Sequence, residues 1–247
     1  MSDLFVESWG SGVPVVLVHG SLATGADEWQ AQRALADAGF RLLVPDRRGY
    51  GRSPAARGED FLADADDVAA LMGDGAHLVG HSYGGLAVLF AAARRPDATL
   101  SLTLLEPAAF ALGRQHHAAR ALAADLRALW DQQVPDEEWV IRFLQAVGSD
   151  PDALSPELIA AAVPLVPVFR RGRPMWETEL PLAALSSAAF PKLVVSGAHS
   201  AGFDAICGEL ADRIGASRMA IEGAGHEIQF TGAPLNDALL TLWRSVS

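Results

Sequence analysis

The sequence has a single cysteine, Cys207, so the chain can form no internal disulfide and no cysteine-based zinc site. This scarcity is typical of a reducing compartment, and we expect a cytoplasmic protein. No apolar run is long enough to span a membrane. The segment from Met1 to Gly10 lacks a basic start followed by an apolar stretch, so we expect no secretory signal. A periodic glycine pattern is also absent, which excludes a collagen-like chain.

Basic residues are outnumbered, since 19 Lys and Arg stand against 30 Asp and Glu, and the formal net charge is −11. The electrostatic field of a chain with this net negative charge repels nucleic acid and anionic membranes. We therefore expect a small-molecule substrate, no nucleic-acid or membrane partner, and a chain that acts as a monomer or a homodimer. Hydrophobic residues make up 50% of the 247 residues and charged residues 20%, which is enough for a sizeable core.

Short apolar runs alternate with helical stretches along most of the chain. The expected strands are 13–18, 40–44, 76–79, 100–105, 192–195 and 218–221. The expected helices are 27–38, 60–72, 86–94, 203–214 and 235–244. Because strands and helices alternate, the sequence predicts an α/β fold with a mostly parallel central sheet flanked by helices on both faces.

The alternation stops between residues 108 and 190, where prolines separate helical stretches around 114–133 and 137–147. This region is too long for an ordinary connection. We expect a core made of residues 1–107 and 191–247, and a helical cap made of residues 108–190. The large aromatic residues of the cap either wall an apolar pocket or form ordinary core between its helices. They are Trp130, Trp139, Phe143, Phe169 and Trp176.

The expected strand 76–79 leads into Gly80-His81-Ser82-Tyr83-Gly84 and then into a helix. The pattern G-x-S-x-G between a strand and a helix indicates a nucleophilic serine on a sharp turn, with glycines that let neighbouring chain pass closely. Ser82 would then lie beside a helix N-terminus, whose dipole favours developing negative charge. The alternative is a glycine-rich turn without a catalytic role.

A serine hydroxyl becomes a nucleophile only when a base takes its proton, and the chain has seven histidines. His226 follows the last expected strand in a glycine-rich loop, which suits an imidazole that moves between a serine and a leaving group. The alternative for His226 is a surface histidine. His116 and His117 are adjacent on a helix and point in different directions, so we expect no metal site.

These motifs resemble those of the α/β-hydrolase family, and the resemblance covers almost the whole chain. His19-Gly20 is similar to the family's oxyanion loop, and Asp46-Arg47-Arg48-Gly49-Tyr50-Gly51-Arg52-Ser53 is similar to its D-x-R-G-x-G-x-S turn. Gly223-Ala224-Gly225-His226 is similar to its histidine loop, and the helical insertion is similar to its cap. The resemblance implies the α/β-hydrolase fold with a helical cap insertion and a Ser–His–acid triad, and no cofactor is expected.

The acid of the triad is where this chain departs from the family. After the strand 192–195 the family has G-x-x-D, whereas this chain has Gly197-Ala198-His199-Ser200. Glu106, after the strand 100–105, is the favoured acid, because some dehalogenase-like relatives place theirs there. Asp204 is the second choice. Either carboxylate could instead be structural, Asp204 at a helix N-terminus and Glu106 under the cap.

The oxyanion hole should consist of backbone N–H groups from Tyr83 and from Ser21, with Leu22 as the second choice for the latter. The arginines of the 46–53 turn are expected to pair with acids rather than to bind phosphate. The expected function is a serine hydrolase that cleaves a carboxylic ester, thioester or lactone of a small to medium apolar substrate through an acyl-enzyme. The alternatives are a C–C bond hydrolase, lyase or cyclase on the same scaffold, or a non-catalytic ligand receptor.

Overall fold

The computed structural model describes residues 3–149 and 155–246. Within these ranges it contains one seven-stranded sheet with the strand order β1-β3-β2-β4-β5-β6-β7. The strands are β1 (Val6–Trp9), β2 (Val13–Val18), β3 (Phe40–Pro45), β4 (Ala76–His81), β5 (Thr99–Leu105), β6 (Lys192–Ser196) and β7 (Ser217–Ala220). Every neighbouring pair is parallel except β1 with β3. The mostly parallel sheet expected from the sequence is therefore confirmed.

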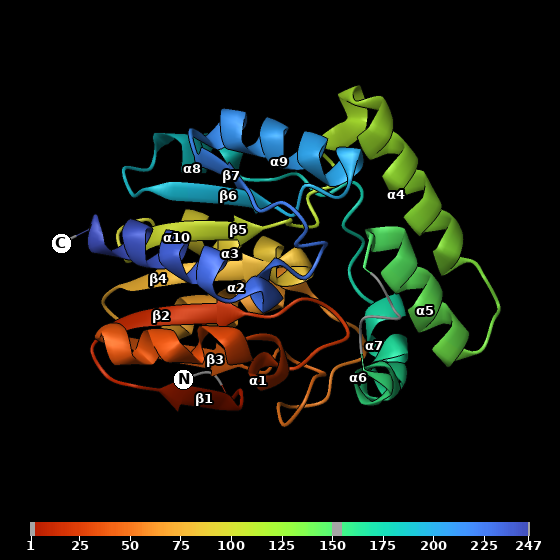
Figure 1. Cartoon of the computed structure of the whole chain (residues 1–247), viewed down its shortest axis with the longest axis horizontal. Coiled ribbons are helices and arrows are strands. Elements are labelled where there is room, and N and C mark those ends of the chain that lie inside the picture. The colour runs from red at the N-terminus through yellow and green to blue at the C-terminus, as the bar shows by residue number, and fades with distance from the viewer. Residues whose placement is uncertain (1–2, 150–154, 247) are drawn as a thin grey trace.

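Helices cover both faces of this sheet (Figure 1). Those of the core are α1 (Gly25–Glu28), α2 (Phe61–Leu71), α3 (Ser82–Arg94), α9 (Ala201–Ile214) and α10 (Ala233–Arg244), with 3₁₀ helices at Gln30–Ala38 and Ile228–Thr231. In the described ranges, no helix is both long enough and apolar enough to cross a membrane.

The core consists of two apolar clusters, one on each face of the sheet. Strand β2 shows the division, because successive side chains of a strand point to opposite faces. Val16 and Val18 belong to the cluster under α2, α3 and α9. Val15 and Leu17 belong to the cluster under α10. All four are fully buried, which explains why this strand is an uninterrupted apolar run.

The described residues between 108 and 190 form helices and no strand. They are α4 (His117–Trp130), α5 (Asp136–Val147), α6 (Pro156–Ala162), α7 (Val166–Arg170) and α8 (Leu182–Ser187), with 3₁₀ turns at Gly113–Gln115 and Val163–Leu165. Helices α4 to α7 lie beyond the carboxyl ends of the parallel strands, whereas α8 lies beside α9 (Figure 1). The division of the chain into a core and a cap stays a prediction.

Three elements differ from the expectations. The edge strand β1 was not expected. The helix expected over 27–38 is interrupted at Trp29, which is fully buried and separates α1 from the 3₁₀ helix that follows. Helix α3 begins at Ser82 instead of Leu86. This last difference matters most for function, because it puts the serine itself at the helix N-terminus.

Candidate active site

Ser82 lies where β4 ends and α3 begins. Its backbone φ is +51°, in the left-handed region that is strained for a residue with a side chain. Gly84 permits the turn, because a Cβ atom there would lie 2.3 Å from the carbonyl oxygen of His19. The serine turn and the His19–Leu22 loop are therefore packed against each other.

Glu106 follows β5, and its carboxylate accepts three hydrogen bonds. Oε2 lies 2.8 Å from Nδ1 of His226 and 2.9 Å from Nε2 of His199, while Oε1 lies 2.7 Å from the backbone nitrogen of Gly197. Because a carboxylate can only accept, both imidazoles present an N–H to it. For His226 this assigns the proton to Nδ1 in the neutral ring, which leaves Nε2 as the nitrogen that can take up another.

The carboxyl of Glu106 is almost fully buried, and burial alone would raise its pKa. The hydrogen bonds from His199 and His226 outweigh this effect and hold the pKa at about 2. Glu106 is therefore ionised at neutral pH and presents a negative charge to both rings.

Asp204, the other carboxylate considered, has different partners. The hydroxyl of Ser196 donates to its Oδ1 at 2.6 Å, and Arg218 pairs with the same oxygen at 3.2 Å. Asp204 lies in the first turn of α9. Of the two carboxylates, Glu106 is the one with an oxygen within hydrogen-bond distance of His226.

His199 is a site residue that the sequence did not reveal. It lies in the loop between β6 and α9, one position before the serine that replaces the family's aspartate. Burial lowers the pKa of His199, but the hydrogen bond and the charge of Glu106 raise it to a net value above its usual range. The loop that lacks the acid thus supplies a second hydrogen-bond donor to Glu106.

Several residues of the site have a strained backbone conformation. Among the described non-glycine residues, those with positive φ are Leu22 (64°), Ser82 (51°), Glu106 (35°) and Ala198 (56°). Ala198 directly precedes His199, and Leu22 lines a pocket together with Ser82. Strained conformations that cluster in this way are typical of functional sites.

Arg47 fixes the loop after β2. Its guanidinium donates to the carbonyl oxygens of His19 (3.0 Å) and Gly20 (2.9 Å). The same group forms buried ion pairs with Glu59 and Asp64, both at 2.9 Å. This arginine of the 46–53 turn therefore pairs with acids, as expected, and holds the loop beside Ser82.

The two residues expected to provide the oxyanion hole have side chains that point elsewhere. The Ser21 hydroxyl donates to Glu59 at 2.8 Å, and the Tyr83 hydroxyl donates to the carbonyl of Glu59 at 3.1 Å. Both residues line a cavity with Ser82. With the side chains engaged by Glu59, backbone N–H groups remain as the donors that these residues can offer.

His81 and Glu28 connect the loop after β2, the Ser82 turn and the loop that carries His226. The sequence analysis did not identify Glu28 as a site residue. Glu28 accepts the Gly20 N–H at 3.0 Å and lies 3.1 Å from Nδ1 of His81. Nε2 of His81 lies 3.0 Å from the carbonyl oxygen of His226. Burial opposes the charge on His81, but Glu28 raises its pKa above the usual value. A charged His81 donates through both nitrogens and so positions the backbone of His226.

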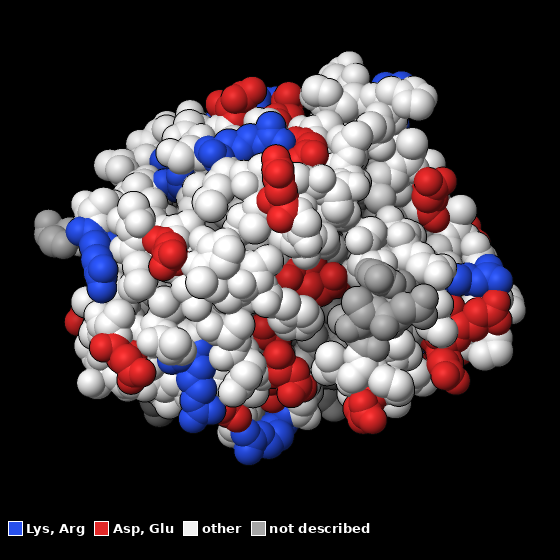
Figure 2. Space-filling view, in the orientation of Figure 1, with Lys and Arg blue, Asp and Glu red and all other residues white. Residues whose placement is uncertain are grey.

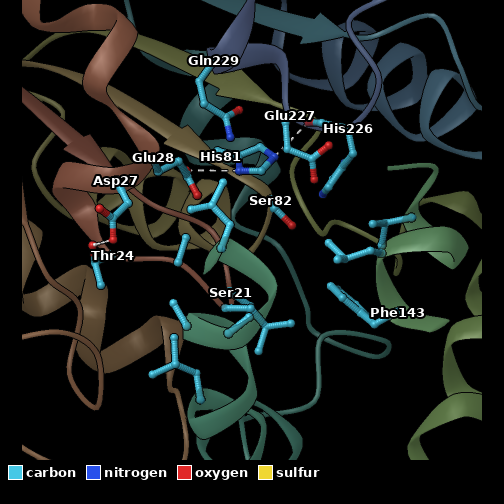
Figure 3. A pocket seen from close by; sticks show the side chains of 18 of the residues that line it. Ser21, Thr24, Asp27, Glu28, His81, Ser82, Phe143, His226, Glu227 and Gln229 are labelled. Atoms are coloured by element: carbon cyan, nitrogen blue, oxygen red, sulfur yellow. Dashed lines mark hydrogen bonds and ion pairs between the residues drawn. The ribbon is translucent and has the colours of Figure 1, made fainter. Parts of the chain in front are cut away.

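Two cavities meet at Ser82. The wide pocket has a volume of about 120 Å³, and Figure 3 shows Ser82, His226 and Phe143 around it. The aromatic pocket has a volume of about 10 Å³. The wide pocket is lined by Leu22, Asp27, Glu28, Ser82, Leu144, Leu158, Ile159, Leu165, His226, Glu227 and Phe230, among others. The aromatic pocket is lined by Ser82, Tyr83, Ala108, Phe110, Leu126, Trp130, Phe169, Met175, Trp176 and Phe203, and both pockets share Ser21, Phe143 and Val147.

Four of the five aromatic residues noted in the region 108–190 line the aromatic pocket and also belong to the core or pack against it, so the two alternatives given for them are both met. Trp139 does not line either cavity as described, and instead stacks on Phe143 with the ring centres 5.5 Å apart. The single cysteine, Cys207, is fully buried in α9.

Glu106, His199 and His226 also form the kind of group that binds metal ions, since their ligand atoms lie within 4.8 Å of one another. In the present arrangement the two imidazole nitrogens hold protons that they donate to the carboxylate. Metal binding would require the loss of both protons.

A profile of the family described as "alpha/beta hydrolase fold" matches residues 13–233, and the chain therefore belongs to the α/β-hydrolase fold family. Its relatives carry several activities in their names. A non-heme chloroperoxidase of Kitasatospora aureofaciens is 45% identical over 89 residues, which is 34% of this chain and 32% of that protein. A lipase of Mycobacterium tuberculosis is 32% identical over 185 residues, 72% of this chain and 68% of that protein. The first match thus spans about a third of its relative's length.

Solved structures agree with this assignment. A thermophilic esterase from Thermogutta terrifontis superposes with a TM-score of 0.71 and 26% identity, covering 98% of this chain and 93% of that one.

Proposed function

We propose that the protein is a serine hydrolase that cleaves carboxylic esters, including thioesters and lactones, with Ser82 as nucleophile, His226 as base and Glu106 as acid. The observation that carries this proposal is the hydrogen bond between Glu106 and Nδ1 of His226, in a chain where His226 and Ser82 line the same pocket. A ring held at Nδ1 keeps Nε2 for proton transfer to and from the serine.

In the proposed reaction Ser82 Oγ attacks the ester carbonyl while His226 takes its proton. His226 then donates that proton to the departing alcohol, leaving an acyl-enzyme, and water repeats the sequence to release the acid. Glu106 stabilises the imidazolium that forms in each half. Backbone N–H groups of Tyr83 and Ser21, with Leu22 as the second choice, stabilise the oxyanion, at about 3 kcal/mol for each donor.

A relative in Acinetobacter calcoaceticus is named a bifunctional esterase/perhydrolase, and this name favours one second candidate, perhydrolysis. If hydrogen peroxide replaces water in attacking the acyl-enzyme, the acyl group leaves Ser82 as a peracid and the serine regains its proton. The two candidates share every residue and differ only in the acyl acceptor. Measuring peracid and carboxylic acid after adding peroxide separates them.

The test of the proposal is hydrolysis of p-nitrophenyl acetate by wild type, Ser82→Ala and His226→Ala. We expect both variants to lose about 10³–10⁶-fold in kcat, as removal of triad members does in other serine hydrolases. A fluorophosphonate should label wild type at Ser82 and leave Ser82→Ala unlabelled. Full activity in folded Ser82→Ala would contradict the proposal. Wild type that neither hydrolyses the ester nor reacts with the fluorophosphonate would instead support a ligand receptor.

A further inference from the structure

The two cavities at Ser82 differ in the reacting groups that line them. His226 lines the wide pocket, and Tyr83 lines the aromatic pocket. Among the described lining residues, neither is shared between the two. An ester carbonyl attacked by Ser82 lies at the junction, and its acyl and alkoxy substituents extend in different directions. The lining residues therefore indicate which substituent enters which cavity.

The leaving oxygen must receive its proton from His226, which requires a separation of about 2.6–3.2 Å. When the leaving oxygen lies next to His226, the rest of the alcohol extends into the pocket that His226 lines. The wide pocket is thus the place for the alcohol part of the substrate. The aromatic pocket, on the Tyr83 side of Ser82, remains for the acyl part.

The sizes of the cavities then limit each part. A single water-sized group needs about 10–15 Å³ by the same measure of volume. The aromatic pocket, at about 10 Å³, has room for one such group, a methyl, and an ethyl fits only if the surrounding rings move slightly. The wide pocket, at about 120 Å³, accepts a ring or a branched chain.

The aromatic pocket is also hard to enlarge, because its rings pack on one another. The Trp130 ring centre lies 5.0 Å from that of Phe169 and 5.5 Å from that of Trp176, and Phe143 lies 4.8 Å from Phe169. Forcing extra methylene groups into such a packed core costs about 1–3 kcal/mol. A longer acyl chain would meet this cost.

The wide pocket, in contrast, has a wall that is partly open to solvent. Two of its apolar lining residues are exposed, Leu158 to 42% and Phe230 to 47%, so part of its wall faces solvent. Asp27 and Glu227 lie on its lining as well, and Figure 2 shows acidic side chains in the hollow between the sheet and the cap helices. The pocket thus suits a bulky alcohol that carries no negative charge.

We propose that the site selects esters of short acids, acetate or propionate, with bulky, apolar, uncharged alcohols, and that Trp130 and Phe169 set the acyl length. This inference rests on the proposed serine hydrolase function. The acyl limit follows from the packed rings, and the tolerance for the alcohol follows from the open aliphatic wall.

Two substrate series test the assignment. In the first, p-nitrophenyl esters run from acetate to octanoate, and wild-type kcat/KM should fall at least about 10-fold between acetate and hexanoate, within the range known for misfit methylenes. In the second, acetates run from methyl to benzyl and 2-phenylethyl, and kcat/KM should rise with the size of the alcohol.

Three variants, two in the aromatic pocket and one in the wide pocket, assign the cavities to the substrate parts. Trp130→Phe and Phe169→Leu shorten one aromatic wall each and should move the best acyl group to butyrate or longer, with little change in the order of the acetates. Leu158→Ala, in the exposed wall of the wide pocket, should change the order of the acetates and keep acetate as the best acyl group. The opposite pattern would overturn the assignment.

The wild-type series decides the inference even if a variant fails to fold. Turnover and fluorophosphonate labelling of Ser82, combined with a preference for octanoate, would overturn the cavity assignment and leave the proposed hydrolase intact. Absence of both turnover and labelling would overturn the hydrolase proposal itself, and the inference with it.

Discussion

Two of the buried carboxylates around the site, Glu59 and Glu106, have partners of different kinds. Glu59 accepts hydrogen bonds from Arg47, Tyr50 and Ser21. Glu106 accepts from His199, His226 and the backbone of Gly197. The guanidinium beside Glu59 stays charged at any pH that a protein survives, whereas an imidazole is a group that can take up and release a proton.

The different partners of Glu59 and Glu106 suit the two clusters to two different tasks, holding a loop and transferring a proton. Burial opposes the charge on Arg47, but Glu59 and Asp64 raise its pKa well above the usual value, so the cation that holds the His19–Leu22 loop is permanent. At Glu106 the carboxylate is the fixed charge, and its partners are imidazoles, which are suited to pass a proton on. A fixed cation suits positioning of backbone donors, and a fixed anion beside imidazoles suits proton transfer.

Within the two clusters around Glu59 and Glu106, the largest effect is expected from Glu106→Gln. All three partners of this carboxylate are donors, so the amide nitrogen of glutamine must face either the two imidazoles or the Gly197 N–H. The variant also loses the charge that stabilises an imidazolium. We expect kcat for p-nitrophenyl acetate to fall about 10²–10⁴-fold, comparable with the loss of the acid's charge in other triads, with the fold retained.

Asp204→Asn is the matched control for this prediction. It removes a carboxylate of the same region whose partners are Ser196 and Arg218. Its activity should stay within about threefold of wild type, since its partners lie apart from His226. An inactive Asp204→Asn beside a fully active Glu106→Gln would show that the acid has been assigned to the wrong residue.

Arg47→Met breaks the other cluster and should act mainly on stability. It leaves Glu59 and Asp64 buried without their cation, and the carbonyls of His19 and Gly20 without their donor. Removing one partner of a buried ion pair costs about 3–5 kcal/mol. Urea unfolding should report a loss of this size in the free energy of unfolding.

Arg48→Met provides the comparison at the neighbouring position. Arg48 is partly exposed and pairs with Asp67 and with the exposed Asp3. Asp67 is buried, but the Arg48 guanidinium is partly exposed, so water can replace part of the lost pair and the variant should lose less stability than Arg47→Met. Equal losses of stability for the two arginine variants would show that the deeper burial of the Arg47 ion pairs makes no difference.

The sequence predicted those parts of the molecule whose signals are local. Strand β2 is apolar at successive positions because both of its faces are buried, and the Ser82 turn needs glycines at fixed offsets. Strand β1 escaped prediction because it has only four residues, and two of them, Glu7 and the exposed Ser8, are polar. The helical propensity of residues 27–38 could not reveal the interruption at Trp29. The interruption accompanies a tertiary contact, the burial of the Trp29 side chain in the core.

The unpredicted site residues depend on contacts between distant parts of the chain. His199 meets Glu106 across 93 positions, and Glu28 meets His81 across 53. In the sequence, Glu28 is one acid in an expected surface helix. The signal for His199 was indirect, since the missing aspartate at position 200 pointed to Glu106 but did not show that a neighbouring histidine would bind it.

The smallest expected effect belongs to His199, and it depends on pH. Its pKa is raised in the folded protein, so the native state holds the proton more tightly than the unfolded chain, whose histidine pKa is about 6.5. The resulting stabilisation is complete below the pKa of the unfolded chain and is lost as the pH rises through the higher pKa of the folded protein.

His199→Gln keeps a neutral donor for Glu106 and removes the charge. We expect it to lower Tm by about 2–4 °C at about pH 5.5, from a loss of about 1 kcal/mol, and by less at about pH 9. His116→Gln, at an exposed histidine 3.8 Å from Glu209, should change Tm little at either pH. A loss for His199→Gln that is larger at the higher pH would show that the ring supports Glu106 as a neutral group and that its charge plays no part.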